Sequence, residues 1–129
     1  SRLKQFIKKR SKIAKFYDKR FKKLFYEKQQ IQKNSISSYH LYVIKIKKKP
    51  YAKERKKLFN ILKKKNFGVQ VHYIPIYRHP FYKKMGFKIK YFPNNEDYYS
   101  RAISLPIFPN LKIKNNERII KILGDYEKL

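Results

Sequence analysis

The spacing of the apolar residues changes repeatedly along this 129-residue chain, and the change limits the folds that it can adopt. From Leu3 to Phe25 apolar residues recur at spacings of three and four, with an interruption at Arg10, and this pattern predicts an amphipathic helix. The same spacing returns later, beside asparagines or a glycine that suit the ends of helices. These later helices are predicted over residues 52–65, from Asn94 or Asn95 to about Ala102, and from Asn115 or Asn116 through Tyr126.

Three short segments between these helices have the composition of β-strands. They are rich in β-branched and aromatic residues, and a proline follows each of them within a few positions. The predicted strands are Tyr39–Ile46, Val69–Tyr73 and Ile103–Leu105. Residues 29–38 are predicted to be a loop. Residues 76–92, irregular but rich in aromatic side chains, are predicted to be an ordered loop with short helical turns.

This order of elements predicts an α/β fold of the α+β type, in which helices cover a small three-stranded, mainly antiparallel sheet. With 42% hydrophobic residues the chain can bury a core, and neither a repeat nor an internal boundary divides residues 1–129 into more than one domain. The chain has no initiator methionine and opens directly on a helical pattern. We therefore expect it to be part of a longer protein.

Several classes of catalytic and binding site lack the residues that they need. The chain has no cysteine, which removes disulfides and thiolate ligands, and its three histidines have no carboxylate close to them in sequence. Three isolated glycines cannot form a glycine-rich phosphate loop or a nucleophile elbow. We therefore expect no metal site and no self-sufficient active site.

No segment is predicted to enter a membrane. The longest uncharged run, residues 68–77, is too short to cross a bilayer, and the first residues lack the apolar centre of a signal peptide. The expectation is a soluble, cytoplasmic protein with no membrane partner.

The formal net charge of +27 suggests an anionic partner. A lysine-rich surface can bind the phosphates of RNA or DNA, so a nucleic-acid-binding module is one hypothesis. However, 28 of the 35 basic residues are lysine, whereas recognition of phosphates and bases favours arginine. The sequence is also rich in residue types with AT-rich codons, and this bias accounts for much of the charge.

One segment has the composition of a ligand-binding site. Between Gly68 and Tyr82 a predicted strand leads into a loop dense in rings and hydroxyl groups, which can hold a base or a sugar. Arg78 is a candidate for a phosphate contact. The alternative is that these rings belong to the hydrophobic core. For the cluster as a whole we favour a site, and its candidate substrate-binding residues are His72, Tyr73, Tyr77, His79, Phe81 and Tyr82.

Five stretches of the sequence match the motifs of one known family. They are Leu3-x-x-Phe6-Ile7-x-x-Arg10-x-x-Ile13-Ala14-x-x-Tyr17, Ser38-Tyr39-His40-Leu41-Tyr42, Gly68-Val69-x-Val71-His72-Tyr73-x-Pro75, Phe81-Tyr82 and Ile103-Ser104-Leu105-Pro106-Ile107-Phe108-Pro109. In this order they resemble the C-terminal part of the DegT/DnrJ/StrS sugar aminotransferases, over nearly the whole chain. Residues 69–77 look most similar to the branch that aminates a UDP-linked 4-keto-6-deoxy hexosamine in pseudaminic acid biosynthesis.

The resemblance implies a fold-type I enzyme in which pyridoxal phosphate forms a Schiff base with a lysine of a large N-terminal domain, and an amino donor, usually glutamate, recharges the cofactor. That domain is absent from this chain, which would be the small C-terminal domain. The resemblance then places His72 and Tyr73 near the sugar, and the nucleotide near Tyr77, His79, Phe81 and Tyr82. It also implies that the full enzyme is a homodimer, and that this chain alone holds no catalytic residue, does not bind the cofactor and does not transaminate.

Two rival hypotheses stay open. One is the lysine-rich nucleic-acid-binding module, and the other is a scaffold or regulatory fragment that docks on the intact enzyme. The sequence contains no specific mark of the second. If the chain is the small domain, part of its apolar surface belongs against the missing domain, so the isolated chain is expected to be sticky or marginally stable.

Overall fold

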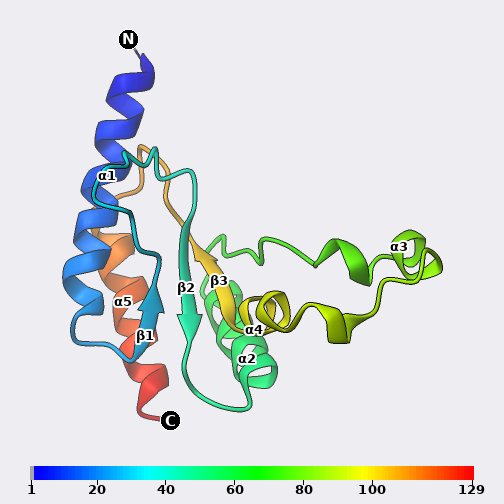
Figure 1. Ribbon diagram of the computed structural model, residues 1–129. Coiled ribbons are helices and arrows are strands. Elements are labelled where there is room, and N and C mark those ends of the chain that lie inside the picture. The colour runs from blue at the N-terminus through cyan, green and yellow to red at the C-terminus, as the bar shows by residue number, and fades with distance from the viewer. Residues whose placement is uncertain (1) are drawn as a thin grey trace.

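A computed structural model describes residues 2–129, in which helices pack around a three-stranded sheet (Figure 1). Figure 1 shows α1 and α5 side by side at one edge of the molecule, with α2 and α4 near the other end of the sheet. In chain order the elements are α1 (Arg2–Phe21), β1 (Tyr26–Lys28), β2 (Tyr42–Ile46), α2 (Tyr51–Lys64), η1 (Ile76–Arg78), α3 (Pro80–Lys84), η2 (Ile89–Tyr91), α4 (Pro93–Arg101), β3 (Ala102–Leu105) and α5 (Ile113–Glu127).

The sheet has the order β1-β2-β3, and both pairings are antiparallel. Tyr26 lies opposite Ile46 in the first pair, and Tyr42 lies opposite Leu105 in the second. Buried and half-buried residues alternate along β2, as expected when one face of a strand points into the core. The predicted fold class, a small three-stranded antiparallel sheet covered by helices, is confirmed.

One of the three predicted strands is wrong. Residues 69–73 form only an isolated bridge between Gln70 and Ser104, and the third strand is instead β1, next to a segment predicted to be a loop. In this antiparallel register Gly68 lies opposite Pro106, which has no N–H to donate, so the pairing ends on that side of the bridge. On the other side, residues 71–73 leave the sheet and lead into the segment that precedes η1. The three residues of β1 are too few to show an alternating pattern in the sequence.

The other predicted elements are confirmed, with ends displaced by a few residues. The first helix stops at Phe21, before the end of its apolar spacing, and α5 continues through Gly124 to Glu127. Residues 76–92 contain the short helical turns that were predicted for them, namely η1, α3 and η2.

The core lies between β2, β3 and the inner faces of α1, α2 and α5. Leu58, Leu62, Ile119 and Leu123 are fully buried, and burial of each such side chain contributes about 1.5–3 kcal/mol. Tyr17 lies at the centre, with its ring centroid 4.9 Å from that of Tyr42. The core therefore uses the apolar positions that gave the helices their spacing.

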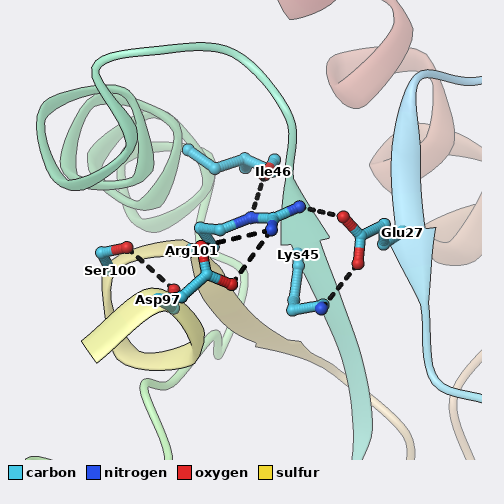
Figure 2. A network of polar contacts seen from close by, with 6 residues as sticks. All are labelled: Glu27, Lys45, Ile46, Asp97, Ser100 and Arg101. Atoms are coloured by element: carbon cyan, nitrogen blue, oxygen red, sulfur yellow. Dashed lines mark hydrogen bonds and ion pairs between the residues drawn. The ribbon is translucent and has the colours of Figure 1, made fainter. Parts of the chain in front are cut away.

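The buried side chain of Arg101, at the end of α4, links this helix to the sheet through hydrogen bonds and ion pairs (Figure 2). Nε of Arg101 donates to the Ile46 carbonyl oxygen at 2.9 Å, and Nη1 pairs with Asp97 at 3.1 Å. Nη2 pairs with Glu27 of β1, and Lys45 Nζ lies 2.6 Å from the second oxygen of that carboxylate. The network therefore joins β1, β2 and α4.

Residues 73–92, here called the arm, project from the body of the domain (Figure 1). The arm leaves after the bridge at Gln70 and returns to the body at the start of α4. It holds many of the exposed large apolar side chains of the described residues, including Tyr73, Ile76, Phe81 and Met85. Among residues 2–129 no helix is long and apolar enough to span a bilayer.

Candidate functional site

Three of the sequence motifs meet at one hollow, here called the motif hollow. It has a volume of about 320 Å³ and lies beside the bridge that joins Gln70 to Ser104. Its walls are His40, Leu41, Gly68, Gln70, His72 and the run Ser104–Phe108. Segments that are up to 68 residues apart in sequence therefore line a single surface. The bridge joins the segment of Gln70 to Ser104, and the pairing of β2 with β3 brings His40 and Leu41 beside them.

His72 and Ser104 form the polar pair of the motif hollow. Nδ1 of His72 lies 2.8 Å from Oγ of Ser104, a hydrogen bond whose donor depends on the histidine tautomer. The backbone bridge next to this pair, in which Ser104 N donates to Gln70 O at 2.8 Å, holds Ser104 beside the segment that carries His72. No carboxylate lines the motif hollow, so this pair is suited to hydrogen bonding a hydroxyl group rather than to activating a nucleophile.

Tyr73 points into a different hollow, here called the tyrosine hollow. The base of the arm and the first turns of α4 enclose about 440 Å³. The walls are Tyr73, Ile74, Pro75, Ile76, Asn94, Asn95, Tyr98 and Tyr99. The rings of Tyr73 and His72 still touch edge to face, with centroids 4.6 Å apart, so the two hollows adjoin along this strand-like segment.

Tyr77 and Arg78 attach the arm to α4. The Tyr77 hydroxyl donates to Glu96 at 2.8 Å, Arg78 Nε donates to the same oxygen at 2.9 Å, and the guanidinium also pairs with the other oxygen. The Arg78 guanidinium holds the pKa of Glu96 below its usual value, while burial raises the pKa of Tyr77 to about 12. Arg78, a candidate for phosphate contact, already has a carboxylate partner.

The other predicted site residues lie toward the tip of the arm. Phe81 and Tyr82 are on α3 with centroids 5.2 Å apart, and a row of rings continues through Phe87 to Phe92, which stacks on Tyr77 at 4.2 Å. His79 is exposed and precedes α3. Of the six predicted residues, His72 therefore lines the motif hollow and Tyr73 lines the tyrosine hollow at the base of the arm. The remaining four lie farther along the arm, outside both hollows: Tyr77, His79, Phe81 and Tyr82.

Several residues of the two hollows were missing from the sequence prediction. His40 and Ser104 belong to motifs that carried the family resemblance, so those motifs held a signal that pointed to the motif hollow. No sequence motif indicated that Asn94, Asn95 and Tyr98 line a hollow. They were interpreted only as the beginning of a helix, because the sequence does not show that the arm folds back over it.

Comparison with known proteins gives the chain a family. Residues 1–124 match the DegT/DnrJ/EryC1/StrS aminotransferase family. The chain belongs to this family. The resemblance predicted from the motifs is therefore confirmed.

Relatives within the family agree with this assignment. The UDP-4-amino-4,6-dideoxy-N-acetyl-beta-L-altrosamine transaminase of Campylobacter jejuni is 36% identical over 110 residues, which are 84% of this chain and 29% of the relative. The uncharacterized protein MJ1066 of Methanocaldococcus jannaschii is 37% identical over 124 residues, 95% of this chain and 31% of its own. The chain thus spans about a third of the length of these relatives.

A protein of known structure has the same fold. The putative sugar aminotransferase Spr1654 of Streptococcus pneumoniae superposes with a TM-score of 0.91 at 23% identity, over 98% of this chain and 32% of its own. That protein has been solved in apo, PLP and PMP forms.

The two hollows do not fit pyridoxal phosphate by themselves. A Schiff base to this cofactor needs a lysine amine in the wall of the site. Neither hollow has a lysine or an arginine in its walls. Within residues 2–129 there is also no group of three histidine, aspartate or glutamate residues that could hold a metal ion.

Proposed function

We propose that this chain is the small C-terminal domain of a pyridoxal-phosphate-dependent aminotransferase that acts on a nucleotide-linked sugar. The observation that carries the proposal is the meeting of three family motifs at the motif hollow, with the His72–Ser104 pair at its centre. A hydroxyl-rich ligand such as a sugar needs polar partners of this kind. The 36% identity to a transaminase of a UDP-linked amino sugar further supports this substrate class.

In this proposal the site residues have separate tasks. His72 hydrogen-bonds the sugar from the motif hollow, and Tyr73 provides a ring face at its border with the tyrosine hollow. Tyr77, together with Arg78 and Glu96, holds the arm in place. His79, Phe81 and Tyr82 form the outer part of the arm, on the side of the nucleotide.

The rest of the enzyme is part of the same proposal. The Schiff-base lysine and the phosphate contacts of the cofactor belong to a large domain that this chain does not supply, glutamate is the amino donor, and the full enzyme is a cytoplasmic homodimer. The finer proposal is a UDP-linked 4-keto-6-deoxy amino sugar as substrate, on the way to pseudaminic acid. The chain spans about a third of its relatives, which is consistent with one domain of such an enzyme.

Titration of the chain with a UDP-linked 4-amino-4,6-dideoxy hexosamine, followed by amide chemical shifts, tests the proposal. We expect shifts centred on residues 70–82 and 104–108, and reduced shifts in a His72→Ala variant. A parallel titration with a short single-stranded oligonucleotide at low and physiological salt separates this function from general attraction to the charge of +27. Oligonucleotide binding that survives physiological salt, with no response to the sugar nucleotide, would favour the nucleic-acid-binding module and contradict the proposal.

A further inference from the structure

A third cavity lies at the end of the molecule that carries the C-terminus, away from the arm. There the start of β1, the end of β2 and the last turn of α5 come together (Figure 1) and enclose about 460 Å³. This volume lies in the range of sites that bind small organic molecules. The walls are Phe25, Tyr26, Ile46, Lys47, Lys48, Tyr126 and Glu127, none of which belongs to the motif hollow, the tyrosine hollow or the arm.

The hydrogen-bonding groups of the aromatic walls are already used within the protein. The hydroxyl of Tyr26 donates to the Leu123 carbonyl oxygen at 3.1 Å, and that of Tyr126 lies 2.7 Å from a carboxylate oxygen of Glu54. The backbone N–H of Phe25 donates to the Glu127 carboxylate. These walls therefore offer a ligand mostly carbon surface, so the part of a ligand that fills the cavity must be apolar.

Two lysine ammonium groups remain as hydrogen-bond donors. Nζ of Lys47 lies 4.8 Å from the centroid of the Phe25 ring, and Nζ of Lys48 lies 5.4 Å from that of Tyr126. Lys48 also lies 3.8 Å from Glu54, whereas Lys47 has no carboxylate within 4 Å among the described residues. The walls thus contain two positive charges, from Lys47 and Lys48, and one negative charge, from Glu127. This balance favours a ligand with an anionic head group over one with a neutral or cationic head group.

We propose that this cavity binds a small amphipathic anion. Its apolar body lies among Phe25, Ile46 and Tyr126, and its single carboxylate or phosphate pairs with Lys47. The proposal does not depend on the function proposed for the rest of the domain, since the two sites share no residue.

Amide chemical-shift titrations with three eight-carbon probes test the proposal on the whole chain. Octanoate and octyl phosphate carry the two candidate head groups, and octylammonium has the same body with the opposite charge. We expect an anionic probe to shift the amides of Phe25, Lys47 and Tyr126, and the tighter of the two identifies the head group. Shifts centred on the arm, no saturable shift with either anion, or equal affinity for octylammonium would overturn the proposal.

A matched pair of variants separates specific binding from attraction to the basic surface. Lys47→Gln removes the proposed partner, while Lys49→Gln removes the same charge from a lysine whose ammonium lies over Tyr51, outside the cavity. We expect Lys47→Gln to weaken the anionic probe about fivefold and Lys49→Gln to leave its affinity unchanged. Equal weakening by both variants would show that only the net charge attracts the probe, and it would refute the site.

Discussion

Tyr17 is the most central of the buried side chains that carry a polar group. Its side chain is fully buried, and its hydroxyl donates to the Pro106 carbonyl oxygen at 3.0 Å and lies 3.4 Å from Asn116 Oδ1. It thereby connects α1 to the turn after β3 and to α5. The apolar spacing predicted that Tyr17 faces the core, but its hydroxyl partners lie about ninety positions away and leave no local pattern in the sequence.

Tyr17→Phe tests this connection. Loss of the hydroxyl leaves the Pro106 carbonyl without this donor in a buried position, so we expect the free energy of unfolding to fall by about 1–2 kcal/mol. Urea denaturation measures the change. Tyr91→Phe is the control because Tyr91 is exposed, and its effect should stay within about 0.5 kcal/mol. Equal stability of the Tyr17 variant and the unmodified chain would contradict the interpretation of Tyr17.

Ion pairs of Glu27 make stability depend on pH. Hydrogen bonds from Lys45 and then from Arg101 hold the pKa of Glu27 below its ordinary value near 4.5. The folded protein therefore keeps this carboxylate ionised at pH values where the unfolded chain takes up a proton. Its stabilising effect is present above about pH 4.5 and is lost as the pH falls through the lower pKa of the folded state.

In a Glu27→Gln variant, the free energy of unfolding should therefore depend less steeply on pH in the acid range. We expect urea midpoints of the unmodified chain to fall more steeply below about pH 5 than those of the variant. Glu117→Gln is the matched control, since Glu117 is exposed and has no ion pair among the described residues. Parallel curves for Glu27→Gln and the unmodified chain would show that the network in Figure 2 does not control this titration.

Among the helices and strands, those with a local pattern of their own, including β2 and β3, were predictable, whereas β1 was not. The spacing predicted the buried faces of α2, α5 and the second half of α1, because one helix face needs only local sequence to define it. In the first half of α1 the same spacing was misleading, since Leu3 and Phe6 are exposed. The three residues of β1 form a strand only because they pair with β2. Residues 69–73 do not form a strand because only Gln70 pairs with β3, at Ser104. The arm was predicted as a loop with helical turns, but its return over α4, which forms the tyrosine hollow, could not be predicted.

Alanine substitutions at two glycines, Gly124 in α5 and Gly86 in the arm, test the backbone conformations of these two segments. Gly124 lies within α5, and a Cβ there would meet Leu24 at an ordinary contact distance of 3.5 Å. Gly124→Ala should therefore raise the free energy of unfolding by about 0.5–1 kcal/mol, because alanine favours the helix. Gly86 has φ near +90°, so Gly86→Ala should lower stability although no atom lies within 4 Å of the added Cβ. Destabilisation by Gly124→Ala would contradict a regular helix at this position.

For the whole molecule, the fold and the family were predictable from motifs, while the division of the candidate site was not. The motifs that carry the family resemblance contain His40, His72 and Ser104, and the fold brings all three to one hollow. The aromatic residues of the same loop were predicted as one cluster. In the structure Tyr73 lines the tyrosine hollow, whereas the hydroxyl of Tyr77 donates to Glu96 and attaches the arm to α4. Tyr77 is therefore a structural contact and not part of either hollow.

The most direct test of the central claim is a chimera. In the Campylobacter jejuni transaminase, the segment that matches this chain over 110 residues would be replaced by the corresponding residues of this chain, and the transaminase activity of the chimera would be measured. If the chain is the small domain of a sugar aminotransferase, the chimera transfers the amino group, and His72→Ala within it lowers that activity. A chimera that folds and shows the absorbance of bound pyridoxal phosphate, yet transfers no amino group to the sugar, would contradict the claim.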